Sequence, residues 1–310
     1  MLYSEIRGKD LEELIEYIIN TDLKYRNSLG IDERISFGVE IEYERALRLI
    51  VDKYIKYKLP GWNSKEDMSL VLGGEVTSPI IGDTKKSWEE LREICILLKR
   101  LNVITNDNAA GHIHIGTQIL GEDLNSWRTF AKTYAIYEDI LFRFLYGEMQ
   151  KGRKRIRMYA APISAMIINS VDSINSAETI RELIWSLPLE QKTKAINFTN
   201  INLQNPSKRS YKNTIEFRIP NGTVNEIVWQ NNINALVKLI LAQKDIDEDF
   251  LNYQIEHDNL PTRLTYDEIC LRKALELVDL IFESDIDKIY FLSQYLKQKK
   301  HKAKTFKLKI

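Results

Sequence analysis

The 310-residue sequence lacks several features that would assign it to a class of protein at once. Its two cysteines are too few for a disulfide framework or a cysteine-rich zinc site. No segment approaches the ~20 apolar residues of a membrane-spanning helix, and the first residues lack the apolar run of a signal peptide. We therefore expect a cytoplasmic protein in which Cys95 and Cys270 are small buried hydrophobic residues.

The sequence also lacks an excess of charge of either sign. Its 44 Lys and Arg residues balance its 44 Asp and Glu residues. A formal net charge of zero creates no overall field that would attract nucleic acid or an anionic membrane, so neither is expected as a partner. The hydrophobic content of 44% and the charged content of 28% are typical of a globular protein.

Several well-known catalytic motifs are absent too. The sequence has no Gly-x-x-x-x-Gly-Lys-Ser/Thr loop and no Gly-x-Gly-x-x-Gly turn, which argues against a P-loop or dinucleotide-binding fold. It has no Gly-x-Ser-x-Gly and no helical His-Glu-x-x-His, which lowers the case for a serine hydrolase or a zincin.

Three short segments alternate apolar and ionisable residues with the period of a β-strand. They are Val39-Glu40-Ile41-Glu42-Tyr43, Gly111-His112-Ile113-His114-Ile115 and Ile215-Glu216-Phe217-Arg218-Ile219. Because residues i and i+2 of a strand point to the same face, each segment can bury its apolar residues and present its polar ones together. We predict an antiparallel sheet with helices on its apolar face. Its polar face would gather Glu40, Glu42, Glu75, His112, Glu216 and Arg218.

The rest of the chain completes an α+β fold. Apolar periodicity predicts helices at residues 9–28, 45–58, 87–101, 123–146, 176–187, 224–242, 265–282 and 285–298. Strands are predicted at residues 35–44, 62–72, 75–79, 103–120, 194–203 and 214–220. Ser176 and Thr265 are expected to be helix N-caps. We expect a single domain over residues 1–310, with a core at about 35–240, a helical C-terminal extension at 241–298 and a basic tail at 299–310.

The carboxylates of the predicted polar face need a counter-charge. Like charges in one cleft raise one another's pKa values and disfavour ionisation. Mg²⁺, or Mn²⁺, supplies this charge and prefers oxygen ligands. Arg218 and the basic segment at residues 151–157 favour a polyanionic ligand, above all a nucleoside triphosphate.

Each of these patterns also has a structural interpretation when it is taken alone. Glu216 and Arg218 could form an ion pair on the sheet surface, and Gly73-Gly74 before Glu75 could be an ordinary hairpin turn. The basic segment could be a solvated loop. It is the combination of the patterns that favours a functional site.

The order of the motifs resembles that of the amidoligase family, within the superfamily of carboxylate–amine ligases that contains glutamine synthetase and glutamate–cysteine ligase. The matching segments lie at residues 37–42, 73–79, 111–114 and 214–218, and the resemblance spans about residues 35–240. It implies that the metal ligands are Glu40, Glu42, Glu75, His112 and Glu216.

The resemblance also implies catalytic and binding roles for other residues. His114 corresponds to a histidine near the phosphate or the substrate, and Arg218 to the arginine that contacts the transferring phosphate. Asp67 lies where the family often has Asp-Gly-Ser/Thr, although Met68 stands here in place of the glycine. Further candidates for nucleotide or substrate contacts are Arg153, Arg155 and Lys194.

The activity implied by the resemblance is an ATP- and Mg²⁺-dependent ligation. A substrate carboxylate would attack the γ-phosphorus of ATP to give an acyl phosphate, and an amine would then displace phosphate to form an amide or isopeptide bond. The partners would be amine and carboxylate substrates such as an amino acid, a peptide or a protein tail. The alternatives are a phosphotransferase of the same superfamily fold, a non-catalytic nucleotide- or metal-binding module, and a metal-dependent hydrolase.

Overall fold

The predicted antiparallel sheet is present in the computed structural model, which describes residues 3, 7, 11–105, 108–146, 156–187, 192–202, 213–257 and 268–296. Within these residues, six strands pair in the order β2-β3-β1-β4-β6-β5, and each pairing is antiparallel. The strands are β1 (Phe37–Glu44), β2 (Asn63–Lys65), β3 (Gly73–Thr77), β4 (Gly111–Gly116), β5 (Ile196–Asn197) and β6 (Thr214–Phe217).

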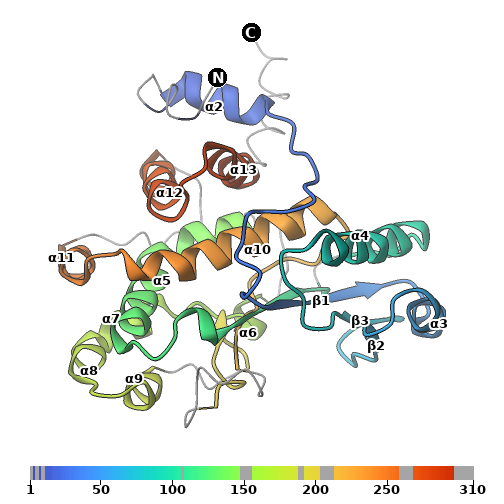
Figure 1. The fold of residues 1–310 in the computed structure, drawn as a ribbon, viewed down its shortest axis with the longest axis horizontal. Coiled ribbons are helices and arrows are strands. Elements are labelled where there is room, and N and C mark those ends of the chain that lie inside the picture. The colour runs from blue at the N-terminus through green and yellow to red at the C-terminus, as the bar shows by residue number, and fades with distance from the viewer. Residues whose placement is uncertain are drawn as a thin grey trace.

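Helices make up most of the remaining described chain, so the fold belongs to the α+β class. They are α2 (Leu11–Asn20), α3 (Arg48–Lys58), α4 (Lys85–Arg100), α5 (Leu124–Leu145), α6 (Ile156–Tyr159), α7 (Ser164–Asn169), α8 (Val171–Ser176), α9 (Ile180–Ser186), α10 (Glu226–Leu241), α11 (Glu248–His257), α12 (Glu268–Ile281) and α13 (Asp285–Tyr295). In Figure 1, α4, α5 and α10 lie along one side of the sheet, and α2, α12 and α13 lie beyond them. None of the described helices is long and apolar enough to cross a membrane.

Aromatic side chains fix these helices on the apolar face of the sheet. Trp88 of α4 stacks on Phe37 of β1, with 5.4 Å between the ring centroids. Phe130 of α5 meets Phe217 of β6 edge-on at 6.4 Å. The alternating apolar residues of β1, β4 and β6 are buried in this layer, as their period predicts.

The predicted C-terminal helical region is present as a layer that packs on α5 and α10. Phe144 of α5 stacks on Phe291 of α13, with 4.0 Å between the centroids. Lys132 is fully buried in α5 and forms an ion pair with Glu248 of α11. One continuous hydrophobic core therefore joins the sheet to the C-terminal helices.

Several predicted strands are shorter than expected. Residues 62–72 contain strand only in β2, because the Asp67 side chain accepts a hydrogen bond from the Ser69 amide at 2.7 Å and forms a local turn that competes with pairing. Of the strand predicted at 103–120, only residues 111–116 are extended as β4, and a 3₁₀ turn follows at Thr117–Ile119. Among the described residues of the strand predicted at 194–203, Ile196 and Asn197 form β5, and Lys194 makes an isolated parallel bridge with Ala161.

The prediction of Ser176 as an N-cap is wrong. Ser176 ends α8, and α9 begins at Ile180 with Thr179 as its N-cap. Thr179 Oγ1 accepts a hydrogen bond from the Glu182 amide at 3.1 Å, while the Glu182 carboxylate accepts one from the Glu178 amide at 2.8 Å. The two bonds resemble a capping box, except that the second donor is the amide of Glu178, the residue before the N-cap, and together they satisfy two backbone donors where the helix begins.

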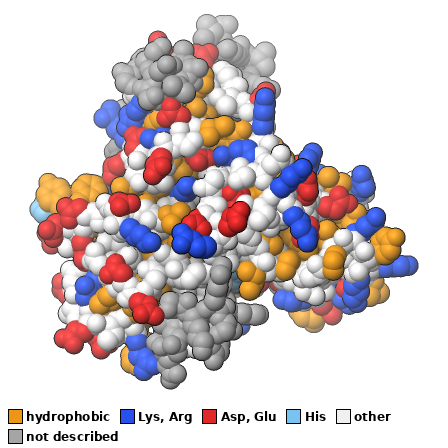
Figure 2. Space-filling model, viewed as in Figure 1, with side chains coloured by type: hydrophobic (Ala, Val, Ile, Leu, Met, Phe, Trp, Pro, Cys, Tyr) orange, Lys and Arg blue, Asp and Glu red, His pale blue; other side chains and the backbone are white. Residues whose placement is uncertain are grey.

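The helix predicted at residues 9–28 is also shorter than expected, because α2 ends at Asn20 and residues 21–28 are not helical. Cys95 is buried, as expected. Thr265, Arg153 and Arg155 lie outside the described part of the chain, together with the predicted basic tail. On the face seen in Figure 2, Lys and Arg side chains are interspersed with Asp and Glu, in keeping with the balanced charge.

Candidate functional site

An acidic group lies where β1 and β3 pair. Glu42 is directly opposite Glu75, and Glu75 is opposite Lys65 of β2. Lys65 Nζ is 3.8 Å from a Glu75 oxygen but is exposed, so solvent screens much of its charge. Burial, aided by the charge of the nearby Glu40, raises the pKa of Glu75 to about 7. Two carboxylates that face each other across a strand pair destabilise the sheet unless a cation lies between them.

Asp67 joins this acidic group from the turn between β2 and β3. One carboxylate oxygen from each of Asp67, Glu42 and Glu75 lies within 4.8 Å of the other two. All three residues line a pocket of 320 Å³ on the polar face. The carboxylate reaches the group even though Met68 follows it instead of glycine. Three oxygen donors at this spacing fit a hard divalent cation such as Mg²⁺ or Mn²⁺.

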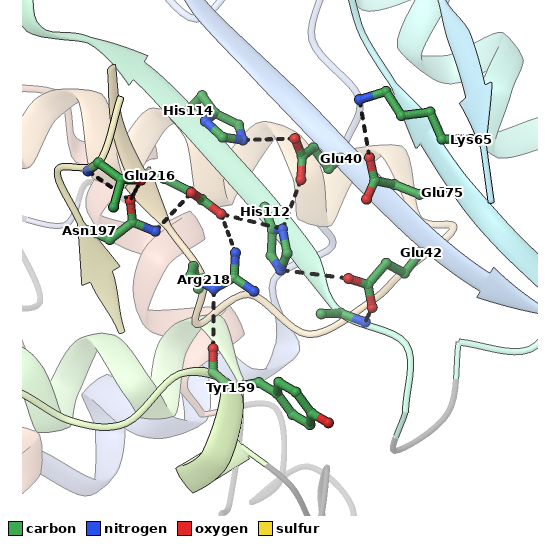
Figure 3. Close-up of polar contacts among 12 residues, drawn as sticks. Glu40, Glu42, Lys65, Glu75, His112, His114, Tyr159, Asn197, Glu216 and Arg218 are labelled. Atoms are coloured by element: carbon green, nitrogen blue, oxygen red, sulfur yellow. Dashed lines mark hydrogen bonds and ion pairs between the residues drawn. The ribbon is translucent and has the colours of Figure 1, made fainter. Parts of the chain in front are cut away.

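His112 of β4 lies at the centre of the polar face, between three carboxylates (Figure 3). Its Nδ1 is 2.9 Å from Glu40 Oε2 and 3.6 Å from Glu216 Oε1. Its Nε2 is 3.7 Å from Glu42 Oε1. The imidazole is buried. Thus β1, β4 and β6 contribute to one connected cluster, as the alternation of their residues predicts.

A second group of possible metal ligands consists of Glu40, His114 and Glu216, whose ligand atoms also lie within 4.8 Å of one another. His114 Nε2 is 3.1 Å from Glu40 Oε1. Burial opposes ionisation of Glu40, but its hydrogen bond with His112 and its close contact with His114 outweigh it and hold its pKa below the ordinary value. Burial likewise opposes ionisation of Glu216, but the charges of His112 and Arg218 bring its pKa below the ordinary value. Both carboxylates are therefore ionised, as metal binding requires.

Arg218 lies immediately after β6, which ends at Phe217 rather than at the predicted residue 220. Its guanidinium forms an ion pair with Glu216, and its Nε donates a hydrogen bond to the Tyr159 carbonyl at 3.1 Å (Figure 3). Arg218 lines both the 320 Å³ pocket and a neighbouring pocket of 960 Å³. Glu40 lines both pockets as well, so these two residues mark the place where the pockets meet.

Two residues that sequence analysis did not assign to the site support it. Asn197 of β5 is fully buried, and its Nδ2 donates to Glu216 Oε2 at 2.8 Å. Glu44 continues the alternation of Glu40 and Glu42, is buried, and accepts a hydrogen bond from the Val71 amide at 2.9 Å. Glu44 could have been identified from the sequence, because it continues the alternation of acidic and apolar residues in β1. Asn197 could have been identified as a polar residue between apolar neighbours.

The remaining candidates have different outcomes. Lys194 Nζ lies 3.6 Å from Met166 Sδ, and Lys194 lines neither of the two pockets. Lys192, which the sequence did not suggest, lines the 960 Å³ pocket. Arg153 and Arg155 lie outside the described residues.

Comparison with known proteins identifies one matching family. The model of a family described as "Putative amidoligase enzyme" matches residues 21–240, which include every strand of the sheet. Among solved structures, one described as "Crystal structure of novel glutamine synthase homolog" is 11% identical, with a TM-score of 0.43, over 87% of this chain and 67% of that chain. No curated protein matches the chain.

Proposed function

The chain belongs to this amidoligase family, which indicates a ligase-type enzyme, and we propose that it is an ATP- and Mg²⁺-dependent carboxylate–amine ligase. The observation that carries the proposal is the convergence of carboxylates, two histidines and Arg218 at the junction of two pockets. A site of this kind suits a reaction in which a polyanionic nucleotide meets two further substrates.

The donor atoms on the polar face fit divalent metal ions. Glu42, Asp67 and Glu75 would hold one ion, and Glu40, His114 and Glu216 would hold a second. When bound, the ions would neutralise negative charge on the phosphates of the nucleotide. Burial, with the charge of Glu40, raises the pKa of Glu75 to about 7, so a cation bound beside Glu75 would favour its ionised form.

The 960 Å³ pocket is the proposed nucleotide site. Its volume lies within the range of about 300–1,000 Å³ of small-molecule sites. At the end shared with the acidic pocket, its wall contains Glu40, Glu216 and Arg218. Phosphates directed toward this end would meet the Arg218 guanidinium, whose fork geometry suits phosphate oxygens and which Glu216 and the Tyr159 carbonyl hold in place.

The proposed reaction has two steps. A carboxylate oxygen of one substrate attacks the γ-phosphorus, the bond to ADP breaks, and an acyl phosphate forms. The amine of the second substrate then attacks the acyl carbon, phosphate leaves, and an amide results. Arg218 stabilises the charge that develops on the transferring phosphoryl group. Holding both substrates over one sheet face lowers the entropic cost of their encounter.

Calorimetric titration with the ATP analogue AMP-PNP, with and without Mg²⁺, tests the nucleotide and metal requirement. We expect binding that depends on Mg²⁺ and that is lost in Glu40→Gln and Arg218→Ala, while the exposed Glu256→Gln of α11 binds like the wild type. Absence of binding by the folded wild-type protein would overturn the proposal. With ATP and candidate substrates, mass spectrometry should detect ADP and an amide. A phosphorylated acceptor without an amide would identify a phosphotransferase instead.

A further inference from the structure

A groove of 470 Å³ lies beside the acidic pocket, between the start of α3 and the turn that leads into β3. Asp67 lines both the groove and the 320 Å³ pocket. A ligand that lies in the groove would therefore have one end next to the group formed by Asp67, Glu42 and Glu75. None of the roles proposed above uses this groove.

The aliphatic side chains that line the groove are unusually exposed. Met68 is 91% exposed, Leu49 68% and Leu72 61%. Figure 2 shows hydrophobic side chains at the surface in the region of α3, at the right of the view, among Lys and Arg side chains. Exposed apolar side chains gathered around a groove next to a polar site are typical of a place where a ligand is bound.

One residue of the groove has an unusual backbone conformation. Leu72 has a φ of 51°, which a leucine rarely adopts. The residues on either side of it lie close to β1: the Val71 amide donates a hydrogen bond to Glu44 at 2.9 Å, and a Cβ on Gly73 would lie 1.9 Å from the Tyr43 carbonyl oxygen. Residues held in rarely populated backbone conformations cluster at functional sites.

The charged residues of the groove have both signs. Arg48 lines it near the start of α3, where the N-cap residue Leu47 offers no side-chain hydrogen bond to the first turn. Glu66 and Asp67 line it on the side of the acidic pocket. A guanidinium favours a carboxylate, the carboxylate of Glu66 favours an ammonium group, and the leucines favour an apolar side chain. An apolar amino acid or peptide carries these three features together.

We propose that this groove binds the amine substrate, and that this substrate is an apolar α-amino acid or a short apolar peptide. Its amino group would point toward Glu66, on the side of the groove that Asp67 shares with the acidic pocket, and its carboxylate would point toward Arg48. The inference rests on the proposed ligase function, because the amino group must approach the acyl carbon at the junction marked by Glu40 and Arg218.

Titration of the dipeptide Leu-Leu into the protein saturated with Mg²⁺ and AMP-PNP tests this inference. The double variant Leu49→Ser/Met68→Ser removes two exposed apolar side chains, so it should fold normally and bind Leu-Leu about 10-fold or more weakly. Arg48→Gln should also weaken binding, and N-acetyl-Leu-Leu should bind more weakly than Leu-Leu. Ile286→Ser is the matched control, because Ile286 is 47% exposed on the distant helix α13.

The possible outcomes separate the groove from the proposed function. If AMP-PNP binds with Mg²⁺ but Leu-Leu does not, or binds equally well to the double variant, the groove assignment is wrong and the ligase proposal stands. If AMP-PNP fails to bind while Leu-Leu binding still depends on Leu49 and Met68, the ligase proposal fails and the groove remains a peptide site. If sedimentation shows a dimer that the double variant dissociates, the groove is a contact between two copies and the inference is overturned.

Discussion

Replacing Asp83 should destabilise the segment that leads into β1. The Asp83 carboxylate is 6% exposed and lies between this segment and α4. It accepts hydrogen bonds from the backbone amides of Leu29 at 2.9 Å and Ile31 at 2.8 Å. It also accepts one from the Ser28 hydroxyl at 2.8 Å and one from the Trp88 indole at 2.6 Å. The same indole packs on β1, so this carboxylate helps to place the strand that carries Glu40 and Glu42.

The expected magnitude follows from the donors that would lose their acceptor. Alanine at position 83 leaves the N–H groups of Leu29, Ile31 and Trp88 without a hydrogen-bond acceptor. Each unsatisfied buried donor costs about 1–3 kcal/mol. Because water can reach part of the space vacated, we expect Asp83→Ala to lower the free energy of unfolding by about 4 kcal/mol, out of about 5–15 kcal/mol for a typical protein. Asp83→Asn keeps one acceptor oxygen and should cost about 2 kcal/mol.

Urea denaturation followed by tryptophan fluorescence measures this loss. Asp32→Ala is the matched control, because Asp32 lies in the same segment but is exposed, where it pairs with Arg34. The control should unfold at nearly the wild-type urea concentration, and the slope of the transition should be the same for all variants. A loss below about 1 kcal/mol for Asp83→Ala, or an Asp83→Asn variant as stable as the wild type, would refute the reasoning.

Three further predictions concern the other ionisable and polar groups. Glu75→Gln removes the repulsion with Glu42, so it should raise the melting temperature without metal and abolish the further rise that Mg²⁺ gives the wild type in thermal denaturation. Asn197→Asp places a like charge against Glu216, so it should weaken Mg²⁺-dependent AMP-PNP binding at least 10-fold by calorimetry, whereas Asn197→Ala should weaken it less. Burial, with the charge of the neighbouring Glu138, raises the pKa of Asp139 from 3.8 to about 7. The folded state therefore binds the proton more tightly than the unfolded state, and the free energy of unfolding declines as pH rises between these values. Asp139→Asn should therefore gain about 1–2 kcal/mol relative to the wild type between pH 5 and pH 8 in urea denaturation, after allowance for partial solvent screening.

The strands that carry the site could be predicted because their signal is local. Glu40 and Glu42 alternate with apolar residues that a sheet must bury on one side, and His112 and His114 do the same. In a strand, every second side chain lies on the same face, and this does not depend on how the rest of the chain folds. For this reason the composition of the polar face followed from the sequence, although the pairing of the strands did not.

The features that the sequence missed or left incomplete depend mostly on contacts between distant parts of the chain. Asp67 was a candidate through the family resemblance, but its place beside Glu42 and Glu75 depends on the turn after β2, which brings it back over the sheet. Asn197 is brought to Glu216 by the pairing of β5 with β6, and β5 is too short for its own sequence to identify it. The helix start at Thr179 was missed for a local reason, since Ser176 is an equally acceptable capping residue and only the contact with Glu182 decides between them.

The distances in the site are set from the opposite face of the sheet. Three of the strands that carry site residues meet a large aromatic side chain on their buried side, Trp88 on β1 and Phe130 on β6. On β4 this side chain is Trp229, which lies so close that a Cβ on Gly111 would be 2.5 Å from its ring. Since packed cores transmit small displacements rather than absorb them, a change in α4, α5 or α10 would move one strand against its neighbours. The carboxylates around His112 come from two other strands, β1 and β6. The geometry that we propose to bind metal and phosphate therefore depends on the packing of helices that contact neither the metal nor the phosphate.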